Sequence, residues 1–175
     1  MALVSSTLQT ALTNMFTTGP TPATMVQHFK DFAQYYDDYA KLATETLGGN
    51  VIATTGKSSF ESTAAAYSAL PTLTLTDYAD YLEQACISYW TSSVFSMAIP
   101  PPGFASLISI TVVPMTPGVL KAGLTATFLA STGVAATLAS SIATLMDTAT
   151  RTVTVTLSGL TPLGAPLTIP MVPIT

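Results

Sequence analysis

The sequence carries very little charge. Asp, Glu, Lys and Arg make up only 8% of its 175 residues, whereas soluble domains usually contain about 25%. Hydrophobic residues make up 49%, which is the opposite of the composition of a disordered chain. A chain of this length can bury a core of its own. The composition therefore predicts one folded domain, or two very small ones, with a surface that is short of charge.

The few charges are also unevenly placed. Only Lys121, Asp147 and Arg151 are charged after residue 83. A free monomer normally keeps a charged surface that maintains its solubility, so a long segment with almost no charge indicates contact with another molecule. We expect the second half to pack against protein, with lipid as the alternative.

Residue types that catalysis or ligand binding would need are scarce. Cys86 is the single cysteine and His28 the single histidine, so no internal disulfide can form. His28 has no nucleophile at a matching spacing. Five scattered basic residues and a net charge of −4 argue against direct binding of nucleic acid. We expect no cofactor, no metal site and no enzymatic activity.

Two motifs nevertheless suggest ligand chemistry. The run GKSS at 56–59 ends like a phosphate-binding loop, but such a loop needs a glycine where this chain has Val51. Asp77, Asp80 and Glu83 share one face at the start of a predicted helix, where negative side chains stabilise the positive end of the helix dipole. We interpret the acidic residues as structural and keep nucleotide binding through the GKSS loop only as an alternative.

The longest uncharged helical segment is 122–146. A membrane-spanning helix needs about 20 predominantly apolar residues, and this segment contains five Thr, three Ser and two Gly, with a break near Gly133. We therefore expect no spanning helix, and a protein that contacts lipid through 104–146 remains the alternative. The first residues lack a basic stretch, so we also expect no signal peptide.

Helical periodicity dominates the first 150 residues, because apolar residues recur three or four positions apart between Pro- and Gly-containing breaks. We expect a mainly α domain over 1–150, with about six helices arranged as three hairpins over 1–50, 58–98 and 117–149. The predicted helices cover 4–16, 22–47, 59–70, 77–97, 117–130 and 134–149.

Two of these helices have the same apolar spacing. LQTALTNMF at 8–16 and LKAGLTATF at 120–128 both read Leu-x3-Leu-x3-Phe. The segments ATMVQHF, ADYLEQA and ATLASSI begin at Ala23, Ala79 and Ala136, with spacings of 56 and 57 residues, and each opens a helix that follows a shorter helix. Three copies of one ancestral hairpin would explain this pattern, and chance similarity among amphipathic helices is the alternative.

The C-terminal segment, 151–175, has a different pattern. RTVTVTLSG at 151–159 alternates Val and Leu with Thr, which indicates a strand, and we expect 151–157 to be an edge strand. Residues 160–175 contain four prolines and no charge, which favours an extended apolar arm. The run SLISITVVP at 106–114 is either a short strand or an extended packing segment.

Aromatic residues crowd around the PPPG break at 100–103. They either fill the core between hairpins or anchor a neighbouring subunit, because aromatic residues are favoured at the centres of interfaces. Together with the apolar residues of the strand and the arm, they give our interface candidates: Trp90, Phe95, Phe104, Val153, Val155, Leu157, Leu167, Ile169 and Val172.

The order of these features resembles a known group of proteins. The Leu-x3-Leu-x3-Phe helix followed by AxxLA, the PPPGF turn and the ending DTATRTVTVTLSG are similar to small Ala- and Thr-rich proteins of unassigned role. These are encoded among the structural genes of tailed bacteriophages and of related prophage or injection systems. The resemblance covers most of the chain in pattern and composition, and it implies a virion or tail-assembly component without assigning functional residues.

These observations lead to one hypothesis. We expect a non-enzymatic structural subunit of a phage or virus-like particle, at its neck, tail or capsid surface. Its partners would be copies of itself and other structural proteins of the particle. It would be assembled in the host cytoplasm and located in the virion. It would contact its partners through the charge-poor second half and through the C-terminal strand and arm.

Overall fold

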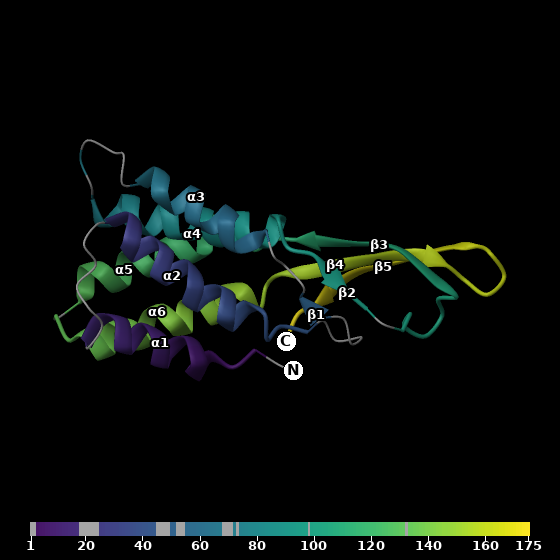
Figure 1. Cartoon of the computed structure of the whole chain (residues 1–175), viewed down its shortest axis with the longest axis horizontal. Coiled ribbons are helices and arrows are strands. Elements are labelled where there is room, and N and C mark those ends of the chain that lie inside the picture. The colour runs from purple at the N-terminus through teal and green to yellow at the C-terminus, as the bar shows by residue number, and fades with distance from the viewer. Residues whose placement is uncertain are drawn as a thin grey trace.

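A computed structural model of the whole chain describes residues 3–17, 25–44, 50–51, 55–67, 72, 74–97, 99–131 and 133–175. A helical body occupies one end of the long axis, and a three-stranded sheet projects from it toward the other end (Figure 1). The mainly α class predicted from the sequence is confirmed.

All six predicted helices are present, with shifted ends: α1 (Ser5–Thr17), α2 (Met25–Ala40), α3 (Gly56–Tyr67), α4 (Leu75–Thr91), α5 (Val119–Ala130) and α6 (Ala135–Thr150). Two helices end well before the sequence predicts: α2 stops at Ala40 rather than at 47, and α4 stops at Thr91 rather than at 97 because the chain turns into the short strand β2 (Phe95–Ser96). This strand pairs antiparallel with β1 (Asn50–Val51). The prediction of helix at 41–44 is wrong, because these residues form a turn that leads to a bridge at Thr44, and the last predicted residues, 45–47, lie outside the described residues.

The helices close into a ring. Each packs against the next in chain order, and α6 returns to pack against α1. Because α1 packs more extensively on α6 than on α2, the body does not divide into three equivalent hairpins along its contacts. The repeat of about 56 residues therefore stays a prediction.

The core of the body is aromatic. Helix α2 buries apolar residues at helical spacing on one side, and among its charged residues only Asp37 is buried with them. The fully buried side chains at the centre are those of Phe29, Phe32, Tyr36, Tyr39, Phe60, Tyr89 and Trp90. The repeated leucines also reach the core, since Leu8 and Leu12 of α1 and Leu120 and Leu124 of α5 are buried.

The sheet has the order β3–β4–β5 and is antiparallel throughout. Its strands are β3 (Ser106–Val113), β4 (Thr154–Leu160) and β5 (Pro166–Pro173). The expectation of a strand at 151–157 on an edge is wrong in position, because β4 is central and pairs on both sides. Its alternation of Thr with Val and Leu suits a strand that separates two different faces.

The extended arm expected after this strand is also wrong. The turn at 161–165 is closed by the N–H of Thr161 on Ala165 O (2.8 Å) and the N–H of Gly164 on Thr161 O (2.9 Å), and it returns the chain along β4 as β5. The last residue then pairs with the body, since Thr175 N–H donates to Thr44 O at 2.8 Å. Proline is tolerated in β5 because an edge strand does not need every N–H.

Candidate functional site

The aromatic interface candidates lie inside the chain. Trp90 is fully buried and donates its Nε1–H to Tyr36 Oη at 2.8 Å. Phe95 and Phe104 are 4% and 8% exposed. Of the two interpretations that the sequence left open for these residues, the structure shows core filling.

The apolar candidates of the C-terminal segment line one face of the sheet. This face packs against the chain that leads into β3, because Phe104 lies over Gly159: a Cβ on that glycine would be 2.7 Å from Phe104 Cδ1. The face is made of buried side chains and of two half-buried ones, Leu167 and Ile169; the buried ones are Val153, Val155, Leu157 and Val172. The structure therefore uses most of these candidates in its own core.

The other face of the sheet carries hydroxyl groups and is open. Thr111 of β3 and Thr168 of β5 are exposed there, and Ser158 Oγ lies 3.4 Å from Thr168 Oγ1. Large apolar side chains are exposed on β3 as well, with Ile108 at 70%. No ionisable side chain occurs in 99–120 or in 152–175, so neither face of the sheet carries one.

The two outer strands of the sheet differ as edges. Strand β5 contains Pro166, Pro170 and Pro173, and proline offers no N–H to an added strand. Strand β3 contains neither proline nor charge, and in the described part of the chain no strand pairs with its outer side. The edge of β3 is therefore the one that neither proline nor charge protects and to which no described strand is hydrogen-bonded.

By contrast, the acidic residues of the body are engaged in holding it together. Asp77 and Thr74 form a capping box at the start of α4. Asp80 pairs with Lys121 of α5 at 2.8 Å, and its hydrogen bond raises the pKa of that lysine. Glu83 is buried and accepts two backbone N–H groups at the start of α5. The acidic triplet thus has structural partners for each of its members.

A second set of polar groups lies between α2, α4 and α6. The buried carboxylate of Asp37 accepts the Tyr89 hydroxyl at 3.0 Å and the Lys41 ammonium at 2.5 Å. Burial, together with this carboxylate, raises the pKa of Tyr89. Burial also raises the pKa of the Cys86 thiol, which keeps it in the unreactive protonated form.

The GKSS run forms the first turn of α3. Lys57 Nζ lies 2.5 Å from Gln34 Oε1 and 3.7 Å from Glu61 Oε1. A Cβ on Gly56 would lie 2.9 Å from Tyr89 O, so this glycine permits the close approach of α3 to α4. Packing and surface pairing account for both residues without a phosphate.

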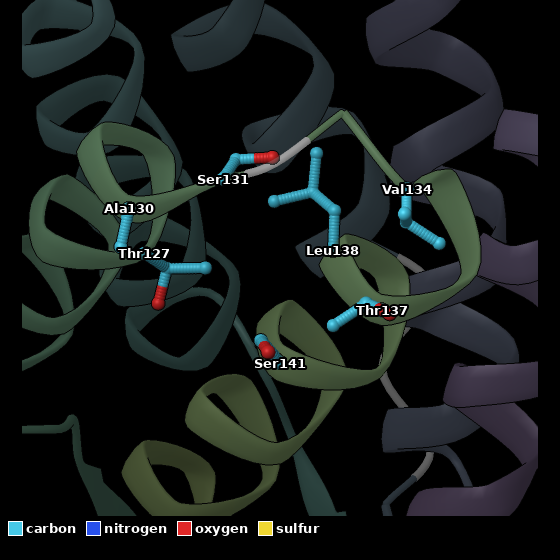
Figure 2. A pocket seen from close by; sticks show the side chains of 7 residues that line it. All are labelled: Thr127, Ala130, Ser131, Val134, Thr137, Leu138 and Ser141. Atoms are coloured by element: carbon cyan, nitrogen blue, oxygen red, sulfur yellow. The ribbon is translucent and has the colours of Figure 1, made fainter.

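A hollow of about 280 Å³ lies where α5 turns into α6 (Figure 2). Its lining combines hydroxyl and small apolar side chains: Thr127, Ala130, Ser131, Val134, Thr137, Leu138 and Ser141. A hydroxyl becomes a useful nucleophile only beside a base, and no member of this lining is an acid, a base or a histidine. The hollow offers a neutral surface rather than a reactive one.

The described residues form neither a metal site nor a membrane-spanning helix. Within the described ranges, no three His, Cys, Asp or Glu residues are grouped so that they could hold a metal ion. In the same part of the chain, none of the helices combines the length and the apolar character that crossing a membrane requires. Comparison with protein-family models, with curated proteins and with solved structures finds no match.

Proposed function

We propose that this protein is a non-enzymatic structural subunit of a phage or virus-like particle, at its neck, tail or capsid surface, and that it binds copies of itself and other structural proteins of the virion. The observation that carries the proposal is the sheet that projects from the body without any ionisable side chain (Figure 1). The pattern resemblance to small proteins encoded among phage structural genes supports the same role.

The chemistry of the sheet suits burial against protein. Covering a charged surface costs several kcal/mol for each ion that is left without a partner, and this surface has no ion to cover. Its hydroxyl groups can donate and accept hydrogen bonds in any orientation, so Thr111 and Thr168 can find partners across an interface. The body, which carries nearly all the charge, can remain in water while the sheet is covered.

Two measurements test the proposal: the mass of the assembly that the purified chain forms, and the presence of the chain in purified particles. Sedimentation of the purified chain over a wide concentration range is expected to show reversible association. Immunoblots of purified particles from the host that encodes the chain are expected to find it in several copies per particle. Absence of the chain from purified particles would refute the particle role, even if the purified chain associates.

A protein that contacts lipid through 104–146 is the second candidate function. It is favoured by exposed apolar side chains on this segment, with Leu129 at 74% and Val134 at 54%. Flotation with phosphatidylcholine and phosphatidylglycerol vesicles tests it, since lipid contact requires the chain to rise with the vesicles. A matched variant, Leu129→Ser, would then reduce flotation, whereas Leu163→Ser in the sheet turn would not.

A further inference from the structure

We propose that the outer edge of β3 pairs antiparallel with β3 of a second copy of this chain, so that two three-stranded sheets join into one across a two-fold axis. This inference rests on the proposed self-assembly and specifies the surface through which it occurs. It is carried by the difference between the two edges of the sheet.

An exposed strand edge presents unpaired backbone N–H and C=O groups, and proteins usually protect it with proline, inward or flanking charge, or a covering segment. Strand β5 has the first kind of protection, through Pro166, Pro170 and Pro173. Strand β3 lacks proline and charge over Ser106–Val113. Its one irregularity is a bulge between Leu107 and Ser109, which leaves 109–113 as a regular strand.

The sequence of this regular strand suits pairing with itself. When the two-fold axis passes through the middle of 109–113, Thr111 lies opposite its own copy, and a charge at this position would oppose a like charge. The run Ser109–Val113 contains no charge and four β-branched residues in five. Branched side chains are the ones that pack best across a strand pair.

Pairing would also extend the apolar face of the sheet. Ile110 pairs with Leu157 and Val112 with Val155 across β3 and β4. The β4 residues of these pairs are fully buried, whereas Ile110 and Val112 at the edge are only half-buried. A second β3 would place its own Ile110 and Val112 on the same face, because directly opposed residues in an antiparallel pair share a face.

The position of the sheet permits this arrangement. The strands run along the long axis and away from the helical body (Figure 1). An antiparallel second copy therefore points the opposite way, and the two bodies come to lie on opposite sides of the two-fold axis. Six strands in one sheet are within the usual range.

Two matched substitutions test the inference. Thr111 and Thr168 are exposed threonines on the same face but on opposite edges of the sheet. Thr111→Lys puts like charges at the two-fold axis, so it is expected to raise the dimer dissociation constant in sedimentation by about tenfold or more. Thr168→Lys adds the same charge to the proline-protected edge and is expected to change it less than about twofold.

Cross-linking gives a second readout that does not depend on charge. Under mild oxidation, Thr111→Cys is expected to form a disulfide-linked dimer much faster than Thr168→Cys, and the buried Cys86 does not compete. Equal rates, or loss of the dimer with Thr168→Lys alone, would overturn the β3 contact. If the wild-type chain associates and both lysine variants associate equally well, the inference fails while the proposed assembly role stands. If the chain stays monomeric and is absent from purified particles, the proposed function fails as well.

Discussion

The buried carboxylate of Glu83 on α4 accepts a hydrogen bond from the backbone N–H of Gly118, with its Oε1 2.7 Å from the nitrogen. Its other oxygen accepts the N–H of Lys121 at 2.9 Å. Gly118 precedes α5 with a φ of 92° and has no side chain that could cap the helix. Helix α4 therefore supplies the N-terminal cap of α5, and negative charge there also opposes the positive end of the helix dipole.

Replacing this cap should destabilise the body. In Glu83→Gln one carboxylate oxygen becomes an NH₂ group that faces a backbone N–H, so a buried donor loses its acceptor. We expect the free energy of unfolding to fall by about 1–3 kcal/mol, measured by urea denaturation. Asp80→Asn, one turn earlier on α4, removes only a surface ion pair and should cost less than about 1 kcal/mol. A loss as large for Asp80→Asn would contradict the capping role.

The hydroxyl of Tyr36 joins three helices. It accepts the Trp90 Nε1–H at 2.8 Å and lies 2.8 Å from Thr150 Oγ1. Tyr36→Phe leaves the buried indole N–H without its acceptor, so we expect a loss of about 1–3 kcal/mol and a changed near-ultraviolet circular dichroism signal from Trp90. Tyr35→Phe, at a half-buried position on the same helix, is the control and should change both quantities little. Equal effects of the two substitutions would show that the hydrogen bonds of the Tyr36 hydroxyl are not the source of the stability.

Local patterns predicted the helices but not their arrangement. Apolar spacing and Pro or Gly breaks place each helix, because both act within a few residues. The contact of α1 with α6 joins residues that are more than a hundred positions apart, and periodicity contains no information about which apolar stripes meet. The same limit explains Glu83, whose partners on α5 lie outside its own helix.

The interface candidates show a second limit. Composition identifies Trp90 and Phe104 as residues that must be covered, but it cannot say whether the cover is the same chain or another. The four prolines of 160–175 favour an extended arm, yet most of this segment pairs as the strand β5. Proline excludes only those hydrogen bonds that its own N–H would donate, and the edge position of β5 does not require them.

Replacing Gly159 by a larger residue should destabilise the sheet more than the helical body. A Cβ at this position would lie 2.1 Å from Ser106 O, a backbone atom of the adjacent strand. Gly159→Ala is therefore expected to separate β3 from β4 and to increase amide hydrogen exchange in the sheet by at least about tenfold, while exchange in the helices changes little. Ser158→Ala, on the open face of the same strand, should leave exchange nearly unchanged. Unchanged protection in Gly159→Ala would contradict the close strand approach.

Stability should fall at mildly acidic pH because of His28. Its Nε2 lies 2.8 Å from the Tyr78 hydroxyl, and burial lowers the pKa of this histidine, partly opposed by the carboxylate of Asp31. Because the unfolded chain binds the proton more readily, near a pKa of about 6.5, the free energy of unfolding decreases as the pH falls through this value toward the lower folded pKa. In thermal melts between pH 7.5 and 5, His28→Gln should lose less stability than the wild type, whereas Asp31→Asn should lose more because the opposing charge is gone. Parallel curves for the wild type and His28→Gln would exclude this histidine as the source.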